Sequence, residues 1–75
     1  MRMRINLDTQ SAVLEFCKIV SNLDGEVRIV GVDGGQEVSV NAKSLLGLLY
    51  SQTWNDIWCE SENDIFSHIS KFAAD

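Results

Sequence analysis

Hydrophobic and polar positions alternate with two different periods along this chain, and each period predicts a different kind of element. Residues 2–7 (RMRINL) are apolar at every second position, which is typical of a half-buried strand. From residue 11 to residue 23 the apolar side chains recur at steps of three and four, as on the buried face of a helix: Val13, Phe16, Cys17, Val20 and Leu23. We therefore expect a strand and then a helix, with Asp8 or Thr9 as its cap.

Residues 26–41 have the pattern of a β-hairpin. The segment EVRIVGV is rich in β-branched residues, and QEVSVN follows with Val38 and Val40 on one face. Between them lies Asp33-Gly34-Gly35, where glycine supplies the positive φ angles that a tight hairpin turn requires. Two antiparallel strands joined by these glycines are therefore predicted.

Residues 42–50 are too rich in leucine and too poor in β-branched residues for a strand. Ser44 stands where a helix start would place a hydroxyl that accepts from free backbone N–H groups. The segment therefore predicts a short second helix with Ser44 as its cap. Gly47 inside it costs about 1 kcal/mol relative to alanine, so this helix is expected to be less rigid than the first.

The last third of the chain predicts a strand and a helix. Residues 54–60 place Ile57 and Cys59 on one face of a strand, with Trp58 on the opposite face. Residues 61–64 (SEND) resemble a capping box before a third helix, whose apolar positions have helical spacing: Ile65, Phe66, Ile69, Phe72 and Ala73. Asp64 and His68, four residues apart, are expected to form a weak ion pair.

The predicted order βαββαβα indicates an α+β fold. A chain of 75 residues supports only one hydrophobic core, so residues 1–75 are expected to form one domain. The arrangement that suits this order is an open-faced two-layer sandwich, in which a four-stranded antiparallel sheet carries three helices on one face.

Composition excludes several classes of function. The chain has 6 basic and 11 acidic residues and a net charge of -5, which argues against direct binding of nucleic acid. No apolar run is long enough to cross a bilayer, and the N-terminal segment lacks the apolar centre of a signal peptide, so we expect a soluble, cytoplasmic protein that does not bind membranes. Cys17 and Cys59 have no CxxC spacing, which favours buried, reduced thiols. Neither a metal site nor a cofactor is expected.

The segment VNAKSLLGL (residues 40–48), together with the element order, resembles the HPr family of phosphocarrier proteins of the bacterial sugar phosphotransferase system. Members carry V-N-x-K-S followed by two bulky apolar residues, a glycine or lysine and another apolar residue. The same segment reads VNAKS in the Crh branch of that family. The resemblance implies the open-faced sandwich and a role in carbohydrate metabolism or its regulation.

The residues that would carry phosphate in such a protein are missing. The family bears a histidine within G-[ILF]-H-A-R-P before its first helix, whereas this chain reads DTQSAV. Thr9 falls at the position of the histidine, and Gln10 and Ser11 follow it. The only histidine, His68, lies in the third predicted helix. Since a phosphohistidine donor passes phosphate to an unprotonated imidazole nitrogen, Thr9, Gln10 and Ser11 form at most a vestigial site.

What the resemblance leaves is regulation and protein binding. It implies that Ser44 is a site of regulatory phosphorylation, although serine is also an ordinary helix cap. It further implies that Leu45, Leu46 and Leu49 bind partner proteins, whereas Leu48 points into the core. The simpler interpretation is that one or two of these outer leucines complete a thin core.

We therefore expect a regulatory protein-binding module and not an enzyme. Its partner would be a component of the phosphotransferase system, a kinase or a transcription regulator, and the chain itself would be a monomer or a weak dimer. Two alternatives stay open. The chain could be a divergent phosphotransfer protein with another acceptor, or a structural module that buries its leucines in a homodimer.

Overall fold

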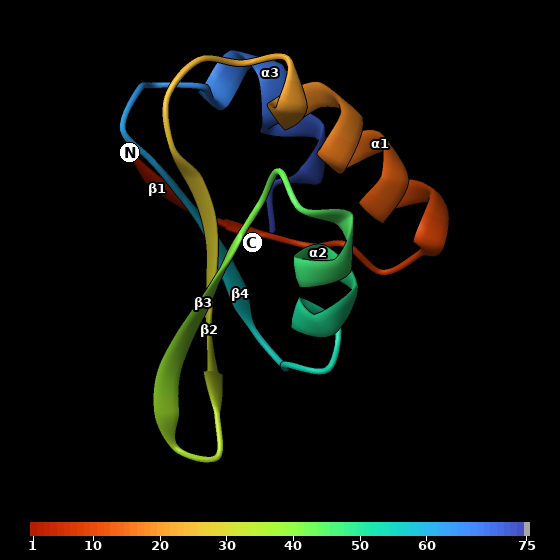
Figure 1. The fold of residues 1–75 in the computed structure, drawn as a ribbon, viewed down its shortest axis with the longest axis vertical. Coiled ribbons are helices and arrows are strands. Elements are labelled where there is room, and N and C mark those ends of the chain that lie inside the picture. Colours follow the sequence, from red (N-terminus) through yellow and green to blue (C-terminus); the bar gives the residue numbers. More distant parts are fainter. Residues whose placement is uncertain (75) are drawn as a thin grey trace.

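The computed structural model describes residues 1–74, and their elements follow the predicted order βαββαβα, with a short 3₁₀ helix at the end (Figure 1). The chain forms these elements in sequence: β1 (Arg2–Ile5), α1 (Gln10–Ser21), β2 (Val27–Asp33), β3 (Gln36–Asn41), α2 (Leu45–Ser51), β4 (Ile57–Ser61), α3 (Phe66–Ile69) and η1 (Ser70–Phe72). The α+β class is confirmed. The longest of these helices, α1, has 12 residues, and none is long and apolar enough to span a membrane.

The four strands form one antiparallel sheet in the order β1-β4-β2-β3. The predicted hairpin is confirmed, because β2 and β3 pair in continuous register from Arg28 opposite Asn41 to Asp33 opposite Gln36. The two-residue loop consists of Gly34 and Gly35, whose φ angles are 59° and 82°. Side chains other than glycine rarely adopt these angles, which explains why the turn consists of two glycines.

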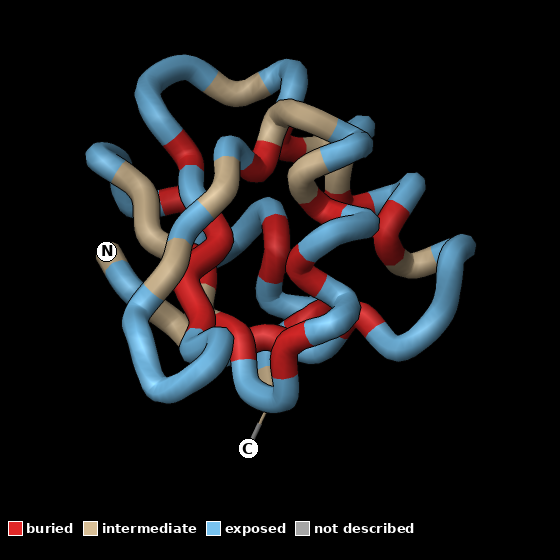
Figure 2. Tube along the Cα trace, turned by 60° about the horizontal axis from the view of Figure 1, so that its bottom comes forward, coloured by how far each residue is buried: buried red, intermediate tan, exposed pale blue. Residues whose placement is uncertain are grey.

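The helices cover one face of the sheet and leave the other open (Figure 1). On the covered face, α1 contributes Val13, Phe16 and Val20, all fully buried, and the ring of Phe16 meets that of Phe72 edge-on at 5.3 Å. Figure 2 shows that the buried residues gather between the sheet and the helices. Thr9 caps α1, since its Oγ1 accepts a hydrogen bond from the amide of Ala12.

The prediction that the fourth strand begins at Trp54 is wrong, because β4 begins at Ile57. The amide of Trp54 instead donates to the Ser51 carbonyl in the turn that follows α2. Its indole is 6% exposed and packs against Gly31, where a Cβ atom would lie only 2.5 Å from Cε3. Within β4 the predicted alternation holds: Cys59 is buried, and Trp58 lies on the open face beneath the guanidinium of Arg2.

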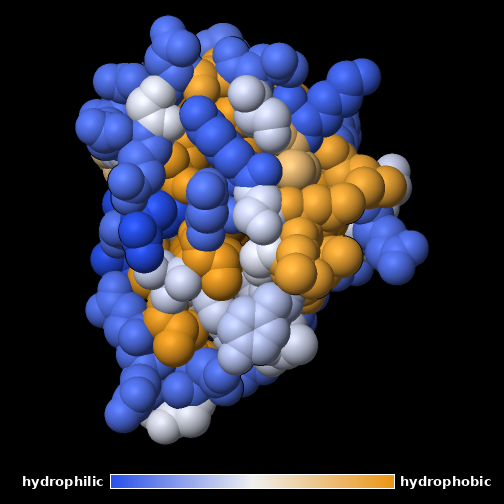
Figure 3. All heavy atoms as spheres, viewed as in Figure 1, coloured by the Kyte–Doolittle hydropathy of each residue, from blue (hydrophilic) through white to orange (hydrophobic). Residues whose placement is uncertain are grey.

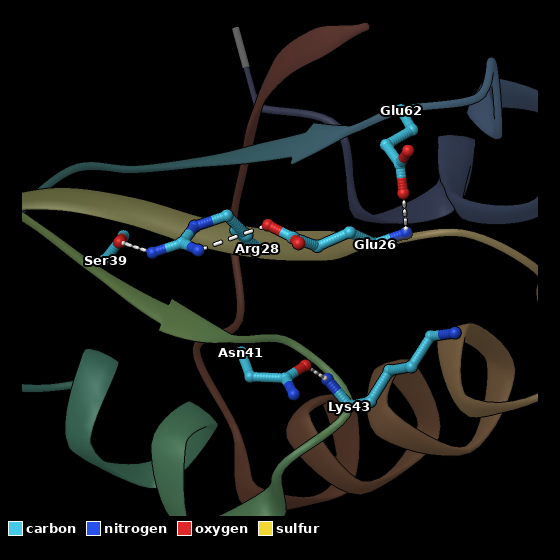
Figure 4. A network of polar contacts seen from close by, with 6 residues as sticks. All are labelled: Glu26, Arg28, Ser39, Asn41, Lys43 and Glu62. Carbon is cyan, nitrogen blue, oxygen red and sulfur yellow. Dashed lines mark hydrogen bonds and ion pairs between the residues drawn. The ribbon is translucent and has the colours of Figure 1, made fainter.

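The capping box predicted for residues 61–64 is also wrong. Ser61 is the last residue of β4, and its hydroxyl donates to the carbonyl of Asn63. Glu62 accepts from the amide of Glu26, at 2.6 Å, so it joins β4 to the start of β2 (Figure 4). Asp64 accepts from the amide of Phe66 and forms no ion pair with His68 within residues 1–74. The third helix is consequently short, only four residues before the 3₁₀ turn.

The C-terminal segment lies along the outer edge of β1. The amide of Asn6 donates to the carbonyl of Phe72 at 2.8 Å, and the amide of Ala74 donates to the carbonyl of Arg4 at 2.9 Å. Ile5 and Ala73 form an antiparallel bridge between these two hydrogen bonds. One edge of the sheet is therefore partly covered by the chain itself.

The buried thiol of Cys59 makes stability depend on alkaline pH. Burial raises its pKa from 9.0 to about 11. The unfolded thiol ionises near pH 9, whereas the folded thiol keeps its proton up to about pH 11. The free energy of unfolding should therefore decrease as the pH rises from 9 to 11, by about 1.4 kcal/mol per pH unit. Urea unfolding at several alkaline pH values measures this slope. A Cys59→Ala variant should show a shallower slope, and equal slopes would contradict the prediction.

Candidate functional site

The candidate site is built around the start of α2. Ser44 caps the helix as predicted: it has extended backbone angles, and its Oγ accepts a hydrogen bond from the amide of Gly47 at 3.2 Å. The turn that leads into it is fixed by Asn41, whose carbonyl accepts from the amide of Ser44 and whose Oδ1 accepts from the amide of Lys43 (Figure 4). Ser44 is half-buried. The hydroxyl is thus part of a defined cap and remains partly open to solvent.

Lys43 fastens this turn to the far end of α1. Its Nζ donates to the carbonyl of Leu23 at 2.6 Å, and its own carbonyl lies 3.9 Å from the thiol of Cys17. At the other end of α2, the side-chain amide of Gln52 donates to the carbonyl of Leu7, just before α1. The two helices therefore lie side by side and run in opposite directions.

Gly47 lets α2 lie close to β3. A Cβ atom at this position would stand 3.1 Å from Cβ of Val40 and 3.2 Å from the carbonyl oxygen of Asn41, tighter than ordinary van der Waals contact. Gly47 lowers the helix propensity of α2, but it also allows the helix to pack closely against β3. Whether α2 is less rigid than α1 remains a prediction.

The side of α2 that faces away from the sheet is apolar. Leu48 is fully buried, as predicted, whereas Leu46 is 78% exposed and Leu45 and Leu49 are each 39% exposed. Tyr50 (54%) and Leu14 of α1 (55%) are exposed as well. We call these five exposed side chains the leucine patch: Leu14, Leu45, Leu46, Leu49 and Tyr50. Figure 3 shows apolar atoms gathered over α2 and the adjoining part of α1.

Sequence reasoning missed two members of this patch. Leu14 lies outside the three- and four-residue spacing of the buried positions of α1, and that departure from the pattern was the available signal. Tyr50 lies at the end of α2 toward the hairpin, where its hydroxyl is 3.4 Å from a carboxylate oxygen of Asp33. The resemblance implied that Leu45, Leu46 and Leu49 lie on a surface that binds partners; Leu46 is mostly exposed, Leu45 and Leu49 are partly exposed, and their role in binding stays a prediction.

The three residues that the resemblance aligned with the phosphocarrier histidine and its neighbours lie at the start of α1, all exposed: Thr9, Gln10 and Ser11. Thr9 and Ser11 line a shallow depression of about 460 Å³ together with Glu15 and Lys71, which form an ion pair across it. His68 is exposed on α3 and does not line this depression. No imidazole is therefore available here to accept phosphate, and the hydroxyl of Thr9 is engaged as the helix cap.

The structure does not bring Thr9 and Ser44 together. Lys43 contacts residues in the second half of α1 and just beyond it, and eight residues of helix, about 12 Å of axial rise, separate Thr9 from Cys17. The cap of α2 and residues 9–11 therefore lie toward opposite ends of α1. One ligand of the size of a phosphate cannot touch both.

The two cysteines lie apart in the structure. Cys59 is fully buried as predicted, whereas Cys17 is only half-buried; they lie on different elements, and neither forms a disulfide within residues 1–74. Within residues 1–74 no group of three or more histidine, cysteine, aspartate or glutamate side chains is placed to share a metal ion.

Comparison of the chain with protein-family models, with curated protein sequences and with solved structures finds no match in any of the three. The resemblance to the HPr family thus depends on residues 40–48 and on the element order. The geometry nevertheless defines a candidate site for protein binding: the leucine patch, with the hydroxyl of Ser44 at the start of the helix that carries most of it.

Proposed function

We propose that this chain is an HPr-like regulatory module that binds another protein through the leucine patch and carries no phosphate on histidine. The observation that carries this proposal is the exposure of Leu45, Leu46 and Leu49 on a helix whose inner position is already filled by Leu48. A helix on the surface of a small domain normally turns polar residues to water. Contiguous apolar side chains on a surface usually mark a place where another molecule binds.

The size of the patch indicates what kind of interface it serves. A standard protein interface takes roughly 20 to 30 residues from each partner, with an apolar centre and a polar rim. The leucine patch supplies five side chains, enough for the centre of such an interface. Lys18, one helical turn after Leu14 and exposed, lies on the adjoining face of α1. The partners proposed are a component of the sugar phosphotransferase system, a kinase or a transcription regulator.

Photo-crosslinking in extracts of the native cells tests the docking surface. A benzophenone amino acid at position 46 should capture a defined partner, whereas the same probe at position 67, exposed on α3, should not. Excess wild-type protein should compete for this product, and excess Leu46→Glu protein should compete much less, because a carboxylate in the apolar centre is costly to bury. The same products from both positions, or equal competition by both proteins, would contradict the proposal.

Phosphorylation of Ser44 would control this surface. A phosphoserine carries a charge of about -1.5 to -2 at neutral pH, here next to Leu45 and at the amino end of α2, where the free amides accommodate negative charge. Ser44 already accepts a hydrogen bond from Gly47, so the phosphate would replace one acceptor with a stronger one. The added charge at the margin of the patch would change which partner binds.

Two phosphoryl donors distinguish regulation from carrier activity. With radiolabelled ATP and the serine kinase of a phosphotransferase system, labelled phosphate should appear on Ser44 and be absent from a Ser44→Ala variant. Loss of the cap costs that variant about 1 kcal/mol, so it should stay folded. With the phosphohistidine donor of the same system, no label should appear. Stable label from that donor on Thr9 or Ser11 would instead favour a divergent phosphotransfer protein.

A further inference from the structure

The outer edge of β3 is built differently from the other edge of the sheet. β3 is the last strand in the order and, within residues 1–74, pairs with no strand other than β2, whereas the C-terminal segment bonds along β1. Natural proteins usually protect such an edge with lysine, proline, a bulge or a covering segment. The sequence of β3, QEVSVN, contains neither lysine nor proline, and its unbroken register with β2 leaves no bulge.

Two residues of β3 turn their backbone groups outward. In a hairpin with a two-residue loop, the two residues that flank the loop form a hydrogen-bonded pair, and the following pairs are in turn non-hydrogen-bonded and hydrogen-bonded. The closing pair here is Asp33 and Gln36, so the backbone N–H and C=O of Glu37 and Ser39 point away from β2. Both residues are exposed. The carbonyl of Asn41, next in this series, is already used by the amide of Ser44.

The side chains along this edge are complementary to a second copy of the same edge. Glu37 makes no hydrogen bond or ion pair through its carboxylate within residues 1–74. Arg28, on β2, extends its guanidinium toward β3, where Nη2 donates to the hydroxyl of Ser39 while Nη1 pairs with Glu26 at 3.1 Å (Figure 4). An antiparallel pair of β3 strands centred on Val38 places Glu37 opposite Ser39 of the partner subunit. Each Glu37 then lies beside the guanidinium that reaches that serine.

We propose that two copies of this chain associate through their β3 edges in this register, joining two four-stranded sheets into one of eight strands. Glu37 and Ser39 of each copy exchange four backbone hydrogen bonds, and Glu37 of each copy pairs with Arg28 of the partner subunit. Val32, exposed on the open face opposite Glu37, gains cover from the second sheet. So few contacts make a weak, concentration-dependent dimer. The inference stands independently of the proposed function, which uses the leucine patch.

Sedimentation velocity from micromolar to millimolar concentration, with two matched variants, tests this inference. The wild type should pass from monomer to dimer over this range. Glu37→Lys should weaken association by at least about tenfold, because it replaces two ion pairs with two repulsive contacts and puts a lysine on the edge. Asp24→Lys, in an exposed loop, changes the net charge equally, from -5 to -3, and should leave association unchanged.

Amide hydrogen exchange at low and high concentration identifies the surface. The amides of Glu37 and Ser39 should exchange more slowly when the protein is concentrated. A wild type that stays monomeric at millimolar concentration overturns the inference, as does a dimer that Glu37→Lys leaves intact. A dimer abolished by Leu46→Glu, with protection over α2 only, would assign self-association to the leucine patch.

Discussion

Replacing Leu48 with alanine should lower the free energy of unfolding by about 2 to 5 kcal/mol. Leu48 is fully buried, on the inner side of α2, so truncation removes apolar contacts and leaves a cavity between the helix and the sheet. A domain of this size has only several kcal/mol of stability in total. The variant should therefore be largely unfolded in moderate urea, where the wild type is still folded.

Leu46→Ala is the matched control, with the same chemical change two residues away. Leu46 is 78% exposed, so its truncation should change the free energy of unfolding by no more than about 0.5 kcal/mol. Urea unfolding followed by circular dichroism measures both variants at a concentration where the protein is monomeric. Similar losses for Leu46 and Leu48 would mean that α2 buries both sides and that the leucine patch is part of the core.

Replacing Gly31 with alanine should destabilise the fold by about 1 to 3 kcal/mol, even though alanine usually suits a strand interior better than glycine. The new Cβ would stand 2.5 Å from Cε3 of Trp54 and 3.3 Å from the carbonyl oxygen of Asp56. Trp54 cannot simply move outward, because it is buried and its ring meets that of Tyr50 edge-on at 5.6 Å. The clash therefore outweighs the gain in propensity.

A double-mutant cycle tests this explanation. In a Trp54→Leu background the space above residue 31 is larger, so adding Gly31→Ala should cost less there than in the wild type. Chemical unfolding of the four proteins gives the coupling energy. Full additivity of the two changes would show that the clash with Trp54 is not the cause.

Local patterns in the sequence predicted the parts of the fold that are determined locally. The glycine pair at 34 and 35 needs no distant contact to form its turn, and the hydroxyls of Thr9 and Ser44 bond to amides three residues ahead. The spacing of Val13, Phe16 and Val20 likewise identified the buried face of α1. In each case neighbouring residues define the geometry, so a single sequence suffices.

The errors arose where distant contacts override the local pattern. The alternation of Ile57 and Cys59 with Asp56, Trp58 and Glu60 predicted a strand that begins at Trp54. The indole of Trp54 instead packs against Gly31, where there is no side chain, and Trp54 lies in the turn before β4. Ser61 resembles a helix cap, yet its backbone pairs with Met1 at the end of β4, so it cannot start a helix. Neither contact leaves a signal in the residues nearby.

The candidate site was partly predictable for the same reason. The resemblance, and not the spacing of the residues, separated Leu48 from Leu45, Leu46 and Leu49, and their exposure agrees with that division. It did not identify Leu14, because α1 and α2 become neighbours only through contacts such as Lys43 to Leu23. Those contacts also place Ser44 far from Thr9, a separation that the sequence does not reveal.

The central claim is that the apolar side of α2 faces solvent and is available to a partner. Methyl NMR with a neutral, soluble gadolinium chelate measures this directly, because relaxation of each leucine methyl increases with its exposure to the probe. We predict the largest enhancement at Leu46, intermediate values at Leu45 and Leu49, and almost none at Leu48. Equal protection of Leu46 and Leu48 in the monomer would contradict the claim and remove the basis for a docking surface on α2.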